Sequence, residues 1–461
     1  MKKIILIISL IISTLFVKAQ DYVLYGMTQY SLFSYDITTG MYSVCDNVSN
    51  PVYSSLMQAS NGLLYGLENE SLFSFDPKTN NLNVVYTFAG GVFGQSPGGK
   101  PLQAKDGYLY GMTTMGGVAN NGVIYRFDPL SGKDTTLLEF NSKNGSEPEG
   151  YFMQDSISGL LYAMTEQGGI STSSSDGVLL SFDPKTYKDS VIMSFIPKSG
   201  NRPEGSVMQA KNRIIYGMCG SGGKNNDGTL FSYDPVSGKE TLLLNFNDTN
   251  GAVPFYGVLL EASNGLLYGM TPNGGKLNGG YGDGVIFAYN AFTGKDSVVY
   301  EFDSIHGAQP YGSLIEDTAN GLFYGLTELG GYYNAGVLFS FDPKTGKDSV
   351  LVNFKVGAGA PLGELLLLRI NPPAGIDELA SNNSGMQVFP SPFNTSTTIV
   401  FSEAGKHYLE LDDITGRQLE EIECNGKQYE LQRNNLAPGI YFIKAFDQEH
   451  DYLVTTKIVV E

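Results

Sequence analysis

The chain has 461 residues, with 47 acidic side chains against 29 basic ones, which gives a formal net charge of −18 at pH 7. This charge repels nucleic acid and anionic lipid, so we expect no nucleic-acid partner. The three cysteines, Cys45, Cys219 and Cys424, show no CxxC spacing, which argues against a disulfide framework and predicts three free thiols.

Residues 1–19 have the features of a secretory signal peptide. Lys2 and Lys3 precede an apolar run over residues 4–16, and small residues follow at the position that a signal peptidase reads, so we expect cleavage near Ala19-Gln20. The apolar run is too short to cross about 30 Å of hydrocarbon, and no later stretch reaches its length. We therefore expect an exported chain without a transmembrane segment after cleavage.

Residues 20–370 contain a unit that recurs seven times. In its clearest copy, four short segments of alternating apolar residues are separated by turn residues, which predicts strands at 312–317, 322–327, 336–342 and 348–354. One tyrosine marks each unit: Tyr25, Tyr65, Tyr110, Tyr162, Tyr216, Tyr268 and Tyr324. Four strands every 40–56 residues are typical of a propeller blade. The fold class is therefore predicted to be all-β, with a seven-bladed β-propeller of four-stranded blades.

The first unit lacks its first strand. It begins directly at 23–28, whereas the last unit is followed by one extra strand-like segment at 360–370. We expect the two chain ends of this region to complete one blade together, because a closed ring leaves no unpaired sheet edge.

An aspartate recurs at the end of each third strand and could suggest a catalytic or calcium-binding series. The set is Asp36, Asp76, Asp128, Asp183, Asp234 and Asp342. A proline or another turn residue follows each of them, and the sixth unit has Asn290 in place of the aspartate. Asparagine caps a turn as well as aspartate does but is a poorer acid, so these residues are interpreted as turn caps. We expect no metal site and no cofactor.

The composition changes after the repeats. Residues 371–387 are rich in Pro, Gly, Asn and Ser and are interpreted as a linker. Residues 388–461 are expected to form a separate, small immunoglobulin-like β-sandwich. Its predicted strands are 396–402, 407–413, 428–432, 439–446 and 451–460, with turns at 415–416 and 425–426.

Two families are suggested by these motifs. The unit LLYGMTPNGG…GDGVIFAYNAFTGKDSVVYEF at 266–302, with its relatives over 21–370, resembles the GloVer tandem repeat of secreted bacterial proteins. It is also similar to kelch propellers in placing a Gly-Gly pair after the second strand, but it departs from them in having no tryptophan. The pairs are Gly116-Gly117, Gly168-Gly169, Gly222-Gly223, Gly274-Gly275 and Gly330-Gly331.

The tail resembles a type A C-terminal sorting domain of type IX secretion. The motifs that carry this resemblance are VFPSPFNTSTTIVF (388–401), DDITGRQL (412–419), LAPGIYFIKA (436–445) and TTKIVVE (455–461). One departure is Ser391, where the family usually has Asn. The resemblance implies the type IX secretion machinery as a partner, and a secreted or outer-surface localisation.

The residues for common hydrolytic chemistry are missing. The only histidines are His306, His407 and His450, and the sequence contains no Ser-His-Asp set across the repeats. A glycosidase needs only two carboxylates. Glu149 and Glu204 each follow a proline at homologous positions, although two solvated loop glutamates are the simpler interpretation.

We therefore carry three hypotheses. The leading one is a secreted or surface-attached binding or adhesion protein without catalytic residues, with a glycan or a surface protein as ligand. The alternatives are a glycan-active enzyme with a carboxylate pair in the propeller channel, and a surface scaffold component.

The candidate binding face is indicated by loop lengths. The interval from the marker tyrosine to the end of the third strand is 11 residues in the first two units and 18 to 22 in the other five. The long loops carry Tyr281, Tyr332 and Tyr333, with Phe255 and Tyr311 on nearby blade-to-blade loops. Aromatic rings among amides suit a sugar or a peptide, so these five residues are the predicted ligand site.

Overall fold

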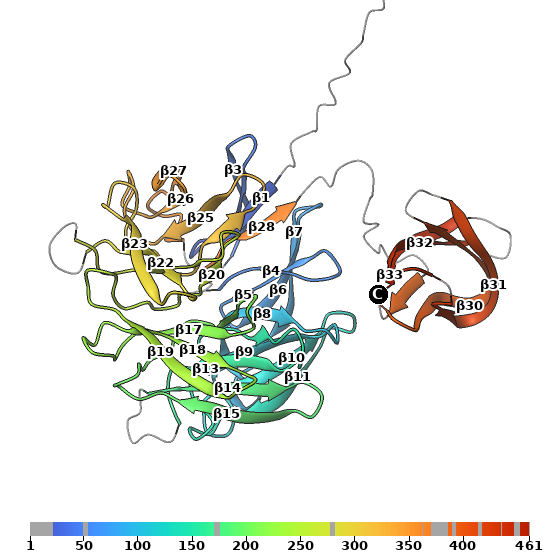
Figure 1. Ribbon diagram of the computed structural model, residues 1–461, viewed down its shortest axis with the longest axis horizontal. Coiled ribbons are helices and arrows are strands. Elements are labelled where there is room, and N and C mark those ends of the chain that lie inside the picture. Colours follow the sequence, from blue (N-terminus) through green and yellow to red (C-terminus); the bar gives the residue numbers. More distant parts are fainter. Residues whose placement is uncertain are drawn as a thin grey trace, which may run out of the picture. The chain divides into compact units, whose positions relative to one another are not determined.

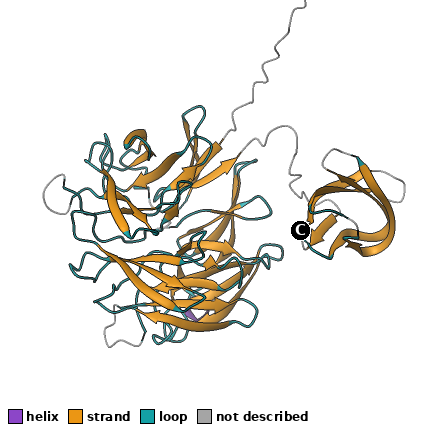
Figure 2. Ribbon diagram, in the orientation of Figure 1, coloured by secondary structure: helices purple, strands orange, loops and turns teal. Residues whose placement is uncertain are grey.

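The computed structural model describes residues 22–48, 54–169, 176–276, 282–361, 363–369, 386–389, 393–413, 417–434, 436–446 and 452–460. Within these residues the chain is almost entirely β-structure, with one short 3-10 helix, η1 (Gly91–Phe93) (Figure 2). The contacts divide the chain into two compact units, of which residues 20–370 form one and the C-terminal sheet belongs to the other.

The first unit is a seven-bladed β-propeller, as predicted, with seven antiparallel four-stranded sheets. We number the blades in chain order and give their strands from the channel outward. Blade 1 contains β28 (Leu366–Arg369), β1 (Tyr22–Met27), β2 (Ser31–Asp36) and β3 (Met41–Asn47). Blade 2 contains β4 (Met57–Gln58), β5 (Leu64–Glu68), β6 (Ser71–Asp76) and β7 (Asn81–Thr87). Blade 3 contains β8 (Gln95–Gln103), β9 (Leu109–Met115), β10 (Val123–Asp128) and β11 (Lys133–Glu139).

The remaining four blades follow the same order. Blade 4 contains β12 (Met153–Gln154), β13 (Leu161–Thr165), β14 (Val178–Asp183) and β15 (Lys188–Ser194). Blade 5 contains β16 (Met208–Gln209), β17 (Ile215–Cys219), β18 (Thr229–Asp234) and β19 (Lys239–Asn245). Blade 6 contains β20 (Leu260–Glu261), β21 (Leu267–Thr271), β22 (Val285–Asn290) and β23 (Lys295–Glu301). Blade 7 contains β24 (Ile315–Asp317), β25 (Leu322–Thr327), β26 (Val337–Asp342) and β27 (Lys347–Asn353).

Blade 1 is completed from both ends of the propeller sequence. Strand β28 pairs antiparallel with β1, with Tyr22 opposite Arg369 and Tyr25 opposite Leu366. Figure 1 shows the orange β28 beside the blue β1. The prediction that the last segment supplies the missing first strand is confirmed, and the ring has no open sheet edge between its ends.

An apolar core lies at each of the seven blade interfaces. Between blades 7 and 1, for example, Leu24, Phe33 and Leu365 pack against Tyr324 and Leu338, all of them buried. The side chains on both faces of the second and third strands are mostly apolar or small. This composition explains the cores, because each sheet is covered by a neighbour on either side. Burial of a side chain of this size stabilises by about 1.5–3 kcal/mol, so these cores hold the ring together.

A glycine in the second strand lets an aromatic ring of the third strand lie against the backbone. A Cβ at Gly269 would come within 2.5 Å of the Phe287 ring, and five other blades repeat the arrangement with Gly26, Gly66, Gly111, Gly217 and Gly325. Blade 4 has Ala163 at this position, opposite the smaller Leu180. Where the second strand has a larger residue, the third strand has a smaller one, so the volume that the pair fills changes little.

Neighbouring blades are also joined by hydrogen bonds from a turn to a side chain. In each case a backbone N–H in the turn after the first strand donates to a Gln or Glu on the first strand of the next blade. The pairs are Ser60 to Gln103, Lys105 to Gln154, Ser156 to Gln209, Lys211 to Glu261 and Ser263 to Glu316. These bonds span the five interfaces from blade 2 to blade 7. Within the described residues, the two interfaces of blade 1 have no member of this series.

The recurring aspartates cap turns, as predicted. The N–H of Lys344 donates to Asp342 Oδ1 at 2.9 Å, and Thr345 Oγ1 donates to its Oδ2 at 2.8 Å. These hydrogen bonds lower the pKa of the Asp342 carboxyl, and the bond from the Lys344 backbone has the largest effect. The N–H of Phe292 donates to Asn290 in the same way at 2.9 Å. The three cysteines are free, which confirms that prediction too.

The second unit is a small β-sandwich formed by one strongly curved sheet. It contains β29 (Met386–Phe389), β30 (Ser396–Asp413), β31 (Gln418–Gln432), β32 (Gly439–Phe446) and β33 (Tyr452–Val460). Figure 1 shows β30 and β31 bending along their length. Apolar residues of all five strands, among them Ile399, Leu409 and Ile443, form its core.

Some strand limits in the tail were predicted wrongly. The predicted strands 396–402 and 407–413 are one continuous strand, β30, because a bulge between Val400 and Gly405 absorbs the irregular segment without a turn. The predicted turn at 425–426 lies within β31, opposite residues of β30, and the other predicted turn, 415–416, lies outside the described residues. Among the described residues, no helix is long and apolar enough to span a membrane.

Candidate functional site

Five long loops distinguish one face of the propeller. These loops join the second and third strands of blades 3 to 7 and span 116–122, 166–177, 220–228, 272–284 and 328–336, whereas blades 1 and 2 have only 28–30 and 69–70. Each long loop contains a Gly-Gly pair whose residues both have positive φ. The backbone N–H of the second glycine donates to a carbonyl in the loop that follows the fourth strand of the preceding blade. Gly331 N–H, for example, donates to Ser304 O at 2.7 Å. We call this side the long-loop face.

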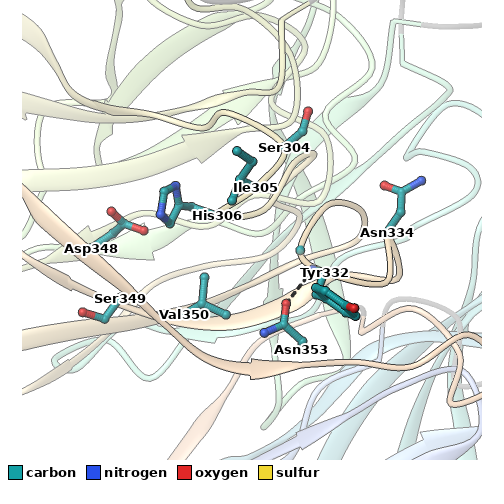
Figure 3. A pocket seen from close by; sticks show the side chains of 10 residues that line it. Ser304, Ile305, His306, Tyr332, Asn334, Asp348, Ser349, Val350 and Asn353 are labelled. Carbon is teal, nitrogen blue, oxygen red and sulfur yellow. Dashed lines mark hydrogen bonds between the residues drawn. The ribbon is translucent and has the colours of Figure 1, made fainter.

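A pocket of about 800 Å³ opens on this face between blades 6 and 7. We call it the rim pocket. It is lined by Ser304, Ile305 and His306 after β23, by Gly331, Tyr332 and Asn334 of the last long loop, and by Asp348, Ser349, Val350 and Asn353 of β27. Figure 3 shows His306 and Asp348 at one end of the pocket and Tyr332, Asn334 and Asn353 at the other. Apolar side chains, Ile305 and Val350, lie between these polar ends.

The most exposed aromatic side chain of the pocket is Tyr332, at 83% of its full accessibility. Its ring makes an edge contact with Tyr333 at 4.8 Å between centroids, and its backbone N–H donates to Asn353 Oδ1 at 2.7 Å. Ile305 is 72% exposed. The loop is thus fixed through its backbone while the ring stays available to a ligand.

A charged group lies at the other end of the rim pocket. His306 Nδ1 is 2.9 Å from both carboxylate oxygens of Asp303, and its backbone N–H donates to the same carboxylate. The hydrogen bond to Asp303 is the main cause of a raised pKa for His306, and the negative charge of Asp348 adds to it. The pocket therefore combines aromatic, amide, carboxylate and imidazole groups.

The predicted ligand residues fall into two groups. Tyr332 and Tyr333 lie at the rim pocket, whereas Phe255 and Tyr311 lie beside the central channel, where Tyr256 makes ring contacts with both, at 6.4 and 6.3 Å. Tyr281 lies outside the described residues. Phe255 and Tyr311, predicted on the blade-to-blade loops, are not among the residues that line the rim pocket.

A ring of close backbone contacts surrounds the channel. Near the first strand of five blades, a glycine packs on the backbone of the next blade, so that a Cβ on Gly150 or Gly205 would come within 2.3 Å of the following glycine carbonyl. Gly99, Gly312 and Gly363 make similar contacts. The repeated Pro-x-Gly motif thus marks residues that face the channel axis, with the residue before the glycine at the mouth on the long-loop face.

Side chains that follow these glycines meet across the channel below its mouth. Lys100 of blade 3 pairs with Glu364 of blade 1, Nζ to Oε2 at 2.5 Å, and Tyr151 of blade 4 donates its hydroxyl to Glu364 Oε1 at 2.8 Å. The Lys100 ammonium also lies 4.3 Å from the centre of the Tyr151 ring. A contact from blade 1 to blades 3 and 4 crosses the ring, so we call these three residues the channel bridge.

Carboxyl groups gather above the channel bridge. The Arg202 guanidinium donates Nε–H to Glu166 Oε1 at 3.1 Å and pairs with Glu204 Oε1 at 2.7 Å. Burial raises the pKa of Glu149 to about 7, with contributions from the charge of Glu166 and, less, of Glu147. Burial also raises the pKa of Glu204, an effect that Arg202 opposes. The interpretation as a solvated loop residue is wrong for Glu204, which is only 3% exposed, whereas Glu149 is half-buried with a buried Oε2 atom.

Several residues of this cluster escaped the sequence analysis. Tyr256 supplies a hydrogen bond to Glu149, and Arg202 lies 5.3 Å from the centre of the Phe255 ring. A comparison of the residues that precede the channel-side glycines in successive repeats would have identified Tyr256 together with Glu149, Glu204 and Tyr311. Among the described residues, no group of three or more acids, histidines or cysteines is arranged to hold a metal ion.

The geometry defines a closed β-propeller with carboxyl and aromatic groups at the mouth of its channel, followed by a small β-sandwich. The Gloeobacter/Verrucomicrobia repeat matches residues 13–219 and 171–385, and the chain belongs to this family. Residues 387–461 match the secretion system C-terminal sorting domain. No curated protein matches the chain.

Solved structures with a similar arrangement are distant. PorZ, described as a surface component of the type IX secretion system of Porphyromonas gingivalis, is 13% identical, with 96% of this chain and 74% of PorZ covered and a TM-score of 0.33. An oligogalacturonate lyase from Vibrio parahaemolyticus is 11% identical, with 72% and 85% covered and a TM-score of 0.43. The extracellular domain of a one-component system from B. thetaiotaomicron is 12% identical, with 95% and 72% covered and a TM-score of 0.36.

The sorting domain indicates where the protein functions. A type IX C-terminal sorting domain implies passage through that secretion machinery, and it indicates a secreted or outer-surface localisation. Any ligand of the propeller is therefore met outside the cell.

Proposed function

We propose that the chain is a secreted or cell-surface binding protein without catalytic activity, and that the rim pocket of blades 6 and 7 receives a sugar or peptide ligand. The observation that carries this proposal is the 83% exposed ring of Tyr332 at the edge of a pocket of about 800 Å³. Pockets of this size accommodate small ligands, and an exposed ring next to amides suits the apolar face and hydroxyls of a sugar.

The surroundings of Tyr332 support a role in binding. Asn353 accepts the Tyr332 backbone N–H, while Asn334 Oδ1 accepts the N–H of Gly330 at 3.1 Å, so the loop is held by side chains on both sides. A fixed loop needs little ordering when a ligand arrives, which limits the entropic cost of binding. Tyr333, which is 41% exposed, and Ile305 extend the apolar surface around the ring.

Tyr332→Ala is expected to weaken binding at least tenfold without lowering the melting temperature, because the ring is exposed and makes no core contact. The ligand would first be identified by screening the full chain on a glycan array and a peptide array, and its affinity then measured by calorimetry. Phe292→Ala is the matched control, since that ring is 97% exposed on the tip of a hairpin outside the pocket. An unchanged affinity in Tyr332→Ala would exclude the rim pocket as the site.

The second candidate is a glycan-active enzyme, and one observation favours it. Glu149 and Glu204 lie close enough for the charge of Glu149 to raise the pKa of Glu204, and the charge of Glu166 raises the pKa of both, as in groups of catalytic carboxyls. In that case the protein should release reducing ends from a polysaccharide, and Glu149→Gln should reduce the rate by at least a hundredfold. If no polysaccharide of a broad panel is cleaved, the enzyme hypothesis fails and the binding hypothesis stands.

A further inference from the structure

We propose that the mouth of the central channel is a second binding site, separate from the rim pocket, and that it takes an organic cation, an ammonium or guanidinium group of a ligand. Four acidic side chains, three aromatic rings and one arginine meet there from blades 4 to 7. The proposal goes beyond the proposed function, because it concerns other residues and fixes the chemistry of the group that is bound.

The charges at the mouth are unbalanced. Glu147, Glu149, Glu166 and Glu204 face one another closely enough for several of them to raise the pKa of a neighbour, and the cation in contact with them is Arg202. That guanidinium is already held by Glu166 and Glu204. Glu147 Oε2 accepts a hydrogen bond from Gln167 at 2.7 Å. Glu149 Oε2, by contrast, is buried and accepts no hydrogen bond within the described part of the chain.

A buried carboxylate oxygen without a donor is costly, and a ligand that donates a charged N–H would remove that cost. The channel bridge lies below the mouth and uses its only cation, Lys100, for Glu364. It therefore crosses the channel below the site without supplying a positive charge to Glu149. A further donor, to the Oε2 atom of Glu149, would come from the long-loop face.

The aromatic residues indicate which kind of cation fits. Phe255, Tyr256 and Tyr311 follow one another in ring contact, and Tyr256 is hydrogen-bonded to Glu149. The guanidinium of Arg202 lies over the Phe255 ring while it contacts carboxylates. This side chain shows that the mouth already stabilises an organic cation between an aromatic face and carboxylates, an arrangement that favours such groups.

A metal ion would need a different arrangement. Calcium and magnesium prefer six or more oxygen ligands that converge on one point, and they gain little from the edge or face of a ring. In the described residues the acids do not form such a group. An ammonium or guanidinium group can instead make one or two charged hydrogen bonds and pack its apolar stem on the rings.

The proposal also sets the direction of the pH dependence. Burial raises the pKa of Glu149 to about 7, so in the free protein this carboxyl holds a proton for roughly half of the time at that pH. A bound cation favours the ionised form, so binding should release protons. The affinity should then increase as the pH rises from 5.5 to 8, because less work is needed to remove the proton beforehand.

The experiment measures binding of Nα-acetyl-arginine amide and Nα-acetyl-lysine amide to the full chain by calorimetry, with Nα-acetyl-glutamine amide as the neutral control. We expect only the two cations to bind, more tightly at pH 8 than at pH 5.5, with proton release revealed by buffers of different ionisation enthalpy. Glu149→Gln should weaken this binding at least fivefold without lowering the melting temperature, whereas Glu240→Gln, the same charge change on the outer strand β19, should have no effect.

Further arms distinguish the source of the cation and the competing explanations. Binding of a deacetylated chitooligosaccharide but not of its acetylated form would assign the cation to an amino sugar, and binding of the amino-acid amides would assign it to a basic peptide; both results support the proposal. Equal binding of the glutamine amide, or an unchanged affinity in Glu149→Gln, would overturn it. Binding of calcium alone, without either amide, would overturn it in favour of a metal site.

Discussion

Deletion of residues 360–370 is expected to lower the melting temperature of the propeller by on the order of 10 °C and to make the protein prone to aggregation. The deletion removes β28, and with it the buried Leu365 and Leu368 and their contacts in the cores on both sides of blade 1. Several kcal/mol of apolar burial are lost, which corresponds to a shift of this size in a large domain. The edge of β1 is then unpaired and open to other chains.

Two comparisons make this prediction specific. Leu368→Asp keeps the chain length but places a charge in the core between blades 1 and 2, and it should lower the melting temperature in the same direction. Deletion of 388–461 should leave the propeller transition unchanged, because we propose that residues 371–387 are a linker between independent domains. A 360–370 deletion that melts within a degree of the intact chain would contradict the role of ring closure.

The closure of the ring could be predicted from the sequence because it follows from the number of strand segments in each unit. The first unit lacks one strand and residues 360–370 supply one, and β28 indeed pairs with β1. The capping role of Asp342 could be predicted for a similar reason, since its partners, Lys344 and Thr345, are two and three residues away in the chain. Local hydrogen bonds and a repeated period leave clear patterns in a sequence.

The channel could not be predicted in the same way. Glu364 meets Lys100 and Tyr151, which are 264 and 213 residues away, and no local pattern connects them. The burial of Glu204 likewise depends on the approach of neighbouring blades. The predicted aromatic ligand site stays a prediction. The exposure of Tyr332 follows from its place in a long glycine-rich loop, whereas the position of Phe255 and Tyr311 follows from the ring around the channel.

The tail shows a different limit. The predicted strand at 439–446 agrees with β32 (Gly439–Phe446), because an alternating apolar pattern and a preceding proline define it. The irregular segment between Val400 and Gly405 predicts a break between strands, but the bulge there lets β30 continue. A bulge and a turn both interrupt the alternation, so only the pairing with β31 distinguishes them.

Glu364→Gln is expected to destabilise the propeller by about 2–4 kcal/mol, because it leaves the Lys100 ammonium inside the channel without a negative partner. The Glu364 side chain is 8% exposed and the Lys100 side chain 22% exposed, so water compensates only in part for the lost ion pair. The variant also weakens the hydrogen bond from the Tyr151 hydroxyl, since a neutral amide is a weaker acceptor than a carboxylate. Calorimetric melting of the full chain measures the effect.

The double variant Lys100→Met, Glu364→Gln provides the matched test of this explanation. Removal of both charges leaves no uncompensated ion, and methionine fills most of the space of the lysine stem beside the Tyr151 ring, so the double variant should be more stable than Glu364→Gln alone. The stabilities of the two single variants and the double variant then give the coupling energy of the pair. If the two single losses simply add in the double variant, Lys100 and Glu364 do not act as a pair, and the channel is closed by packing alone.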